Sequence, residues 1–354
     1  MVKRFAFAVP GDLATPTGGY AYDRRMIAEL GNLGWHVDLL DLGDGFPSPD
    51  AATKATARTR LLGVPAGRTI VIDGLALGVL PDVAAELAGR NPLLALVHHP
   101  LALEAGLTST RAESLRRSEH AALASVRGVI VTSPATARLI MSDYGVPAER
   151  VTIARPGSDR IPPAQDRSER RPDAMRLLSV GAIVPRKGFD VLVAALATLT
   201  DLSWRLTIAG DLTRDRNAAT QLQADIARHE LGERIAVLGT VSPQRLAELY
   251  ADADLFVLAS HFEGYGMAYA EAVAHGLPVI GSNAGAIPDT VPQDAGLLVA
   301  PGDVSALAQA LRRVIEDDGL RRRLAGAARA AAPQLPTWRD SAETFARALG
   351  MALT

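Results

Sequence analysis

The stretch from Leu255 to Gly285 constrains the fold most, because short apolar runs alternate in it with glycine-containing loops and one helical segment. The run Leu255–Leu258 predicts a buried parallel strand. Glycines in the next loop allow a tight turn, and a helix is expected from about Met267 to His275. A second strand is expected over Pro278–Gly281. This strand–helix–strand order is typical of a parallel sheet covered by helices.

Two carboxylates, Glu263 and Glu271, frame the turn and the helix of this stretch. The helix start at Gly266 and Met267 offers unpaired backbone N–H groups and a partial positive charge, which suits a phosphate. Glu271 could then reach the hydroxyls of a sugar attached to that phosphate. Glu263 follows the carboxyl end of the strand, where open parallel sheets bind ligands. Two glutamates alone would favour solvated side chains, but their coincidence with the glycines and the helix start favours a binding site.

The composition is that of a globular protein with more than one domain. The chain has 354 residues, 48% of them hydrophobic and 21% charged, which is enough for two domains with separate cores. A net charge of −2 does not indicate a nucleic-acid partner. The absence of cysteine excludes disulfides and thiolate catalysis and fits a reducing compartment. The N-terminal apolar run breaks at Pro10, too early for a signal peptide, so we expect a cytoplasmic protein.

Alternation of short apolar runs with amphipathic segments predicts doubly wound parallel sheets in both halves of the chain. The strands expected in the first half cover residues 5–9, 36–42, 69–72, 93–97, 128–132 and 151–154. Those of the second half, beyond the two already given, cover 177–181, 205–209 and 235–238. The expected domains are residues 1–158 and 176–337, with a hinge over 159–175 and a last helix over 338–354. The first strand is not followed by Gly-x-Gly-x-x-Gly, which argues against a dinucleotide cofactor.

Two features of the first half are candidate site residues. Gly18 and Gly19 precede a helix expected from about Tyr20 to Leu33 and would let backbone approach a ligand, although an ordinary strand-to-helix turn explains them equally well. His98 and His99 follow a buried strand, where a histidine can donate hydrogen bonds to a substrate. The alternative is a structural or metal-binding histidine. Adjacent residues of an extended chain point in opposite directions, so both histidines are not expected on one metal.

Arg186 and Lys187 are the candidate cations of the second half. They precede a helix expected over Phe189–Leu199, and no Gly-Lys-Ser/Thr is present that would make a Walker loop. Two cations at a helix start can neutralise a diphosphate, the arginine through a fork and the lysine as a point charge. Solvation of both side chains is the alternative. Asp252 and Asp254 have the spacing of a metal-binding Asp-x-Asp, which we reject because the pair lies between a helix and a buried strand.

Several of these segments together resemble the retaining glycosyltransferases of family 4, which have the GT-B fold. The resemblance lies in Glu-Gly-Tyr-Gly-Met from Glu263, Glu-Ala at Glu271, and Gly-Leu-Pro-Val-Ile-Gly-Ser from Gly276. It continues through Gly-Leu-Leu-Val-Ala-Pro-Gly-Asp from Gly296 and covers roughly residues 176–330. It implies an α/β protein with two Rossmann-like doubly wound parallel-sheet domains facing across a cleft. The nucleotide-sugar donor would bind the second domain and the acceptor the first, and the last helix would cross back onto the first.

The resemblance also assigns roles to individual residues. The donor-binding residues it implies are Gly18, Gly19, Arg186, Lys187, Val241, Gly266, Met267 and Glu271, and the catalytic residues are His98 and Glu263. Val241 would lie beside the base and Glu271 would hold the ribose. Glu263 would hold the hydroxyls of the transferred sugar, and so would His98, with His99 as the alternative to His98.

The sequence therefore predicts transfer of a sugar from a nucleoside-diphosphate sugar, either GDP-mannose or a UDP-sugar, with retention at the anomeric carbon. Front-face attack is expected, in line with the family, because no covalent nucleophile is evident. No metal or other cofactor is expected. The acceptor is a small metabolite, a glycan or a lipid-linked molecule; no nucleic acid or membrane span is expected, and association with a membrane surface stays open.

Two alternatives remain. A nucleotide-sugar epimerase shares the two-lobed architecture, although the Glu-x7-Glu spacing speaks against it. A non-catalytic two-lobed sugar-binding protein is the other, against which the Arg186-Lys187 pair and the missing signal peptide argue.

Overall fold

The computed structural model describes residues 3–104, 106–159 and 174–352. The chain forms two compact units, one of residues 1–157 with 336–354 and one of residues 158–335. Each unit contains one six-stranded sheet, and the strand pairs are parallel. The hinge expected over 159–175 falls mostly on 160–173, which lie outside the described residues.

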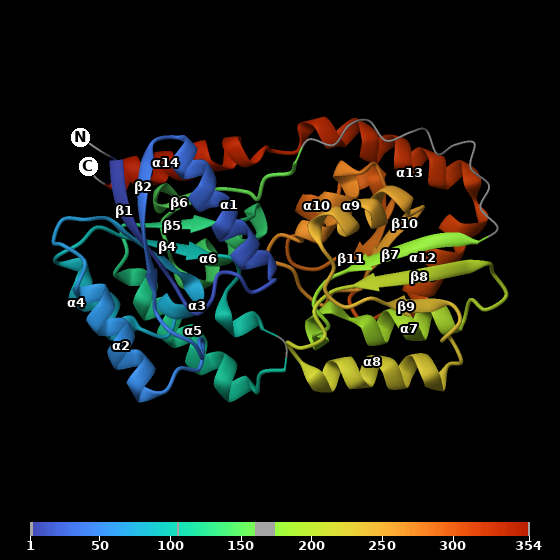
Figure 1. Cartoon of the computed structure of the whole chain (residues 1–354), viewed down its shortest axis with the longest axis horizontal. Helices are drawn as coiled ribbons and strands as arrows, with labels where there is room; N and C mark the ends of the chain where they lie inside the picture. The colour runs from blue at the N-terminus through green and yellow to red at the C-terminus, as the bar shows by residue number, and fades with distance from the viewer. Residues whose placement is uncertain (1–2, 105, 160–173, 353–354) are drawn as a thin grey trace. The chain divides into compact units, whose positions relative to one another are not determined.

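Unit 1 carries the first six strands of the chain (Figure 1). Its strands are β1 (Lys3–Val9), β2 (Trp35–Asp41), β3 (Ile70–Asp73), β4 (Leu93–Val97), β5 (Gly128–Val131) and β6 (Val151–Ile153). Its α-helices are α1 (Gly18–Asn32), α2 (Ala51–Leu62), α3 (Gly74–Leu77), α4 (Pro81–Ala88), α5 (Ser109–Ala124), α6 (Pro134–Tyr144) and α14 (Trp338–Ala352), and its short 3-10 helices are η1 (Leu101–Leu103) and η2 (Ala148–Arg150).

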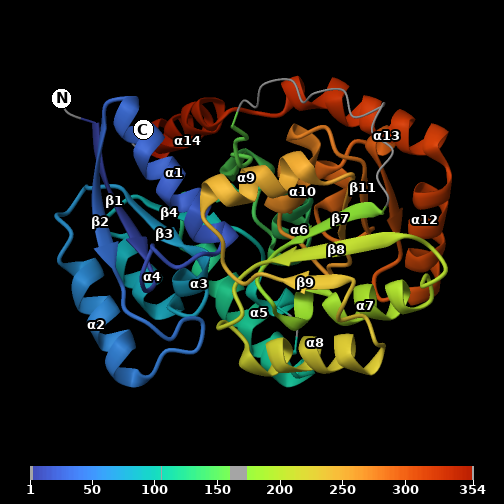
Figure 2. The same ribbon diagram turned by 45° about the vertical axis from the view of Figure 1, so that its right-hand side comes forward.

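The sheet of unit 1 has the strand order β2-β1-β3-β4-β5-β6, so the direction of winding reverses between β1 and β3. Helices α2, α4 and α5 cover one face and α1 and α14 the other (Figure 2). The residues of β3, β4 and β5 are all buried, as expected for strands covered on both faces. In α14, the fully buried ring of Phe345 packs 6.5 Å from that of Phe5 and 6.4 Å from that of Phe7.

Unit 2 repeats this plan with its own strands and helices (Figure 1). Its strands are β7 (Met175–Val180), β8 (Trp204–Ala209), β9 (Ile235–Val237), β10 (Leu255–Leu258), β11 (Val279–Ser282) and β12 (Gly296–Val299). Its α-helices are α7 (Phe189–Ala197), α8 (Arg216–Arg228), α9 (Pro243–Asp252), α10 (Met267–Ala274), α11 (Ile287–Thr290), α12 (Val304–Glu316) and α13 (Asp318–Ala331), and its 3-10 helices are η4 (Pro185–Lys187), η5 (Gln293–Ala295) and η6 (Ala332–Gln334).

The sheet of unit 2 has the order β12-β11-β10-β7-β8-β9, so its winding reverses between β7 and β10. These two strands pair in register with Leu255 opposite Leu177. Helices α7, α8 and α12 lie on one face of the sheet, and α9, α10 and α13 on the other (Figure 2). In open parallel sheets, ligands bind beyond the carboxyl ends of the strands at the point of reversal. The loops that follow β7 and β10 are therefore where a ligand of unit 2 is expected.

The prediction of doubly wound parallel sheets is confirmed, with differences at the ends of elements. Helix α1 begins at Gly18 rather than Tyr20, because Thr17 is its N-cap and accepts a hydrogen bond from the Tyr20 amide. Helix α5 begins at Ser109 in the same way, with Thr108 as the cap that accepts a hydrogen bond from the Arg111 amide. Elements that the sequence analysis did not identify include α8, α13 and β12. Among the described residues, the helices are too short or too polar to cross a bilayer.

Candidate functional site

A three-residue ion-pair cluster lies at the reversal point of unit 2. The ammonium Nζ of Lys187 lies 2.6 Å from Oε1 of Glu263, and Nη1 of Arg186 lies 3.1 Å from Oε2 of the same carboxylate. The Ser260 hydroxyl also donates to Oε1, at 2.7 Å. The three charged side chains are mostly buried, with 14% of Lys187, 18% of Arg186 and 7% of Glu263 exposed. The cluster carries one net positive charge, which suits an anion.

The charge state of Glu263 follows from this surrounding. Burial alone would raise the pKa of its carboxyl, but the Lys187 and Arg186 cations and the hydrogen bonds from Lys187 and Ser260 outweigh burial. They lower the pKa of Glu263 to about 2. The side chain is therefore a permanent counter-ion that fixes both cations. Both of its oxygens already accept hydrogen bonds. The role of Glu263 toward the sugar's hydroxyls stays a prediction.

Backbone geometry brings the two loops of the cluster together. Gly188 follows Lys187 with φ +63°, and a Cβ there would lie 2.1 Å from the Ala259 carbonyl oxygen, so only glycine fits. The Arg186 carbonyl accepts a hydrogen bond from the His261 amide at 2.8 Å, and Nη1 of Arg186 donates to the Phe262 carbonyl at 2.7 Å. The β7 and β10 loops are thus joined by main chain as well as by charge.

Helix α10 begins beside this cluster. Its N-cap is Gly266, with φ +88°, which has no side chain to occupy the first amides of the helix. Met267 is the first helical residue. A Cβ built on Gly266 would lie 3.8 Å from the Cβ of Glu263, so the helix start and the ion-pair cluster are neighbours. The predicted diphosphate ligands Arg186, Lys187, Gly266 and Met267 therefore come together in one unit.

Glu271 lies one turn further along α10 and is bonded to a tyrosine of α9. Oη of Tyr250 donates to Oε2 of Glu271 at 2.8 Å. Burial raises the pKa of Glu271 to about 6, while the Tyr250 hydrogen bond opposes the rise. Asp159 raises this pKa further and Lys187 lowers it, so the Lys187 charge reaches Glu271 as well as Glu263. Val241, predicted beside a base, lies half-buried in the loop between β9 and α9.

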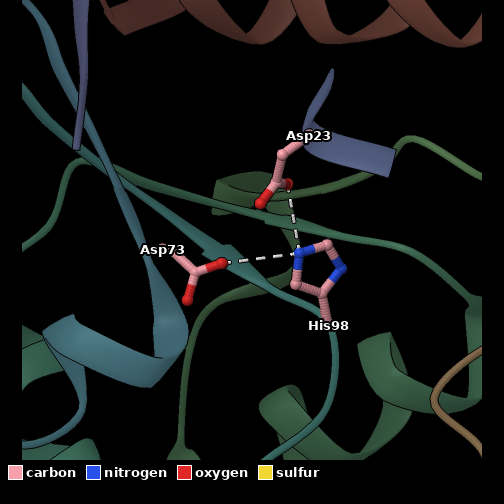
Figure 3. A group of neighbouring side chains, drawn as sticks. All are labelled: Asp23, Asp73 and His98. Atoms are coloured by element: carbon pink, nitrogen blue, oxygen red, sulfur yellow. Dashed lines mark ion pairs between the residues drawn. The ribbon is translucent and has the colours of Figure 1, made fainter. Parts of the chain in front are cut away.

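A second cluster lies in unit 1, around the predicted catalytic histidine (Figure 3). Nε2 of His98, in the loop after β4, lies 3.2 Å from Oδ1 of Asp23 on α1 and 3.5 Å from Oδ2 of Asp73 at the end of β3. Both carboxylates are buried, and 20% of the His98 side chain is exposed. Nδ1 of His98 points away from both aspartates in this view. A Cβ on Gly19 would lie 3.4 Å from the imidazole, so Gly19 packs directly against His98.

The two aspartates determine the charge of His98. Burial would lower the pKa of His98, but the negative charges of Asp23 and Asp73 outweigh burial and raise it to about 10. Asp23 itself has its pKa raised to about 6 by burial, against the opposing effect of His98. The three ligand atoms lie within 4.8 Å of one another, so the cluster could instead hold a metal ion. A proton on His98 and a bound cation are thus two ways of balancing the same charge.

The remaining predicted residues lie as follows. Gly18 is the first residue of α1, one position before Gly19. Nε2 of His99 lies 3.1 Å from the carboxylate of Glu104, so the two histidines serve different partners, as expected for adjacent residues. The Asp254 carboxylate accepts hydrogen bonds from the backbone and guanidinium of Arg176. It is therefore engaged as a structural ion pair.

Sequence analysis missed four residues that contact predicted site residues. They are Asp23, Asp73, Tyr250 and Ser260. A sequence signal existed for Asp73. It lies at the carboxyl end of a buried apolar strand, as His98 does. A signal also existed for Asp23, a carboxylate on the buried face of an amphipathic helix. Tyr250 and Ser260 have ordinary sequence surroundings, and only the fold brings them to the two glutamates.

Comparison with solved structures defines the class of fold. The chain is similar to sucrose-phosphate synthase from Thermosynechococcus elongatus, with a TM-score of 0.81 and 23% identity over 98% of this chain and 99% of that one. It is also similar to Anabaena Alr3699/HepE in complex with UDP and glucose, with a TM-score of 0.76 and 20% identity over 97% and 99% of the two chains. The two six-stranded parallel sheets and these likenesses show the GT-B fold.

Sequence comparisons match part of the chain to one family. The family described as glycosyl transferases group 1 matches residues 162–331. A D-inositol 3-phosphate glycosyltransferase of Xylanimonas cellulosilytica is 31% identical over 60% of this chain and 54% of its own length. An MMP alpha-(1->4)-mannosyltransferase of Mycolicibacterium hassiacum is 27% identical over 85% and 75%. Residues 162–331 thus match the group 1 glycosyltransferases. The chain spans about half the length of several curated relatives that it matches.

Proposed function

We propose that the protein transfers a sugar from a nucleoside-diphosphate sugar to an acceptor, with retention at the anomeric carbon. The donor is GDP-mannose or a UDP-sugar, and the acceptor is a small metabolite, a glycan or a lipid-linked molecule. Unit 2 binds the donor nucleotide, and unit 1 binds the acceptor. The reaction requires no metal ion or other cofactor, and it takes place in the cytoplasm.

The observation that carries this proposal is the buried Arg186–Lys187–Glu263 cluster next to the start of α10. The cluster has one net positive charge, and the helix start adds a partial positive charge and free amide donors. A diphosphate is the common ligand for such a combination of fork-shaped and point cations with a helix start. The match of residues 162–331 to the group 1 glycosyltransferases supports the same ligand.

The chemistry follows from where charge develops. As the bond between the sugar and the diphosphate breaks, the leaving diphosphate gains negative charge. Arg186, Lys187 and the amides of Gly266 and Met267 are already oriented, so they stabilise that charge without rearrangement. Glu263 holds both cations in place and, in the proposal, faces the sugar's hydroxyls. The acceptor hydroxyl attacks the anomeric carbon from the face that the diphosphate leaves and passes its proton to the departing diphosphate oxygen, so the configuration is retained.

The proposal is tested in two stages. Thermal-shift measurements with UDP, GDP and ADP identify the base, because a nucleotide that binds the folded state raises the melting temperature. The matching nucleotide-sugars are then incubated with candidate acceptors, and release of nucleoside diphosphate and the anomeric configuration of the product are followed by NMR. Conversion of the donor without an acceptor would indicate an epimerase instead. Binding without any turnover across the acceptor classes would indicate a sugar-binding protein.

A further inference from the structure

Tyr250 connects two helices at the carboxylate that the proposed function assigns to the ribose. It lies on α9, is 1% exposed, and its hydroxyl has two acceptors within reach. These are Oε2 of Glu271 at 2.8 Å and the Ala268 carbonyl oxygen at 3.2 Å. A phenol has one proton, and the nearer, charged acceptor forms the stronger bond. The Tyr250 hydroxyl therefore donates its hydrogen bond to Glu271.

The tyrosine ring is fixed independently of this hydrogen bond. It stacks on the imidazole of His275, at the end of α10, with ring centroids 4.9 Å apart and planes inclined by 16°. It also stacks on Phe256 of β10, at 6.1 Å and 27°. A ring held on two sides keeps its hydroxyl in one position. Glu271 has three side-chain torsions that are costly to order, so a rigid donor reduces the conformations that its carboxylate can adopt.

We propose that Tyr250 is a positioning residue for donor recognition, which orients the Glu271 carboxylate toward the ribose of the nucleotide. Among the described residues, Tyr250 alone donates a hydrogen bond to this carboxylate, through Oε2. Oε1 then serves as the acceptor for the ribose hydroxyls. The inference rests on the proposed function, because it takes Glu271 as the ribose ligand.

The hydrogen bond also keeps Glu271 in its charged form. The other groups that act on this carboxylate are Asp159, which favours the neutral form, and Lys187, which favours the charged form. Removing the tyrosine hydroxyl therefore lets a larger fraction of Glu271 bind a proton near neutral pH. A protonated glutamate is a weaker acceptor for the ribose hydroxyls, so nucleotide binding would weaken at a higher pH than in the wild type.

The test compares a ligand that has a ribose with one that lacks it. Isothermal titration of the 354-residue chain with UDP, GDP and inorganic pyrophosphate measures the two parts of the site separately. We expect Tyr250→Phe to weaken binding of the preferred nucleoside diphosphate about tenfold, the usual cost of losing a hydrogen bond to a charged group. Pyrophosphate should bind the variant and the wild type equally. The pH below which nucleotide affinity falls should be higher in Tyr250→Phe than in the wild type.

A matched control and a second variant accompany this substitution. Tyr144→Phe removes a comparable tyrosine–glutamate hydrogen bond, to Glu119 in unit 1, and should leave nucleotide binding unchanged. Glu271→Gln keeps the shape of the side chain and leaves Tyr250 intact, and it should show the same selective loss of nucleotide over pyrophosphate. In the background of Glu271→Gln, Tyr250→Phe should reduce nucleotide affinity by a smaller factor than it does in the wild type.

Three results in the variants would overturn the inference and leave the proposed function intact. Equal weakening of pyrophosphate and nucleotide binding in Tyr250→Phe would show a general structural role, and unchanged nucleotide binding would show no role. Additive losses in the double variant would show that Tyr250 does not act through Glu271. Failure of the wild type to bind either nucleotide while it binds pyrophosphate would instead contradict the proposed function, and the inference with it.

Discussion

Lys187 and Glu263 are in direct contact, with Nζ of the lysine 2.6 Å from Oε1 of the glutamate. The two residues are 76 positions apart in the sequence and follow β7 and β10, the neighbouring strands at which the sheet of unit 2 reverses its winding. The contact holds a cation in place before any ligand arrives. A diphosphate that binds there meets oriented donors rather than flexible side chains, which lowers the entropic cost of binding.

The lysine of this contact is expected to be necessary for turnover. Lys187→Ala removes the charge that is proposed to stabilise the leaving diphosphate, and we expect kcat to fall by about two orders of magnitude or more. Steady-state kinetics with the identified donor checks the result. Lys54→Ala is the control, because Lys54 is an exposed lysine of α2 in the other unit. Turnover in Lys187→Ala equal to that in the control would contradict the proposed role.

The glutamate of the contact is expected to act as a counter-ion that an anion can replace. Glu263→Gln leaves two mostly buried cations without their carboxylate, which should destabilise the protein by about 3 kcal/mol. Inorganic pyrophosphate should restore more of the melting temperature in this variant than it adds to the wild type. Glu86→Gln, which breaks an exposed pair with Arg58, should cost less than about 1 kcal/mol and should gain no more from pyrophosphate than the wild type does. Equal gains in all three proteins would disprove the counter-ion role.

The same glutamate predicts how stability depends on pH. Its pKa is lowered from 4.5 to about 2 in the folded protein, so its stabilising contribution is complete above pH 4.5 and is lost as the pH falls toward 2. The difference in melting temperature between wild type and Glu263→Gln should therefore be largest near neutral pH and should shrink below pH 4.5. A difference that stays constant across this range would show that Glu263 is not held charged by its neighbours.

In unit 1, the two aspartates are expected to keep His98 protonated. The raised pKa of His98 predicts an imidazolium at pH 8, and Asp23→Asn or Asp73→Asn should lower this pKa toward or below its usual value of 6.5. NMR chemical shifts of the His98 ring nitrogens, followed from pH 5 to 10, measure the change. A neutral His98 in the wild type at pH 8, together with metal in the purified protein, would show that a cation occupies the cluster instead.

Metal removal is expected to leave the reaction unaffected. In the proposed function, Arg186, Lys187 and the start of α10 provide the positive charge that a divalent ion would otherwise provide to the diphosphate. Dialysis against EDTA should therefore not change the initial rate of transfer, measured with the identified donor in metal-free buffer. Loss of the rate, with recovery on adding Mg²⁺ or Mn²⁺, would contradict this expectation.

The parallel sheets were predictable because buried strands of this kind leave a simple signal. Runs such as Leu93–Val97 and Leu255–Leu258 are apolar throughout, and the structure ends them at the same residues. Strand β12 was missed because it is only half-buried and lies among glycines and prolines. Helix α13 was missed because alanines and arginines dominate it and obscure its apolar stripe. The pattern of apolar residues therefore identifies elements with a distinct buried face and does not identify the others.

The site was predictable only where its residues are close in sequence or follow a strand. Glu263, Glu271 and the start of α10 belong to one strand–loop–helix unit, and Arg186 and Lys187 follow a strand that pairs with it. The partners that orient them come from elsewhere. Tyr250 reaches Glu271 from α9, and Asp23 reaches His98 from α1. Both pairings depend on helix packing, and no local pattern in the sequence names the partner.

The central claim is that unit 2 binds the diphosphate of the donor on the ion-pair cluster at the start of α10. A crystal structure with the nucleoside diphosphate selected by thermal shift tests it most directly. We predict phosphate oxygens within hydrogen-bonding distance of Lys187 Nζ, the Arg186 guanidinium and the Met267 amide, and ribose hydroxyls on the Glu271 carboxylate. A nucleotide bound away from these groups, or bound only by unit 1, would contradict the account.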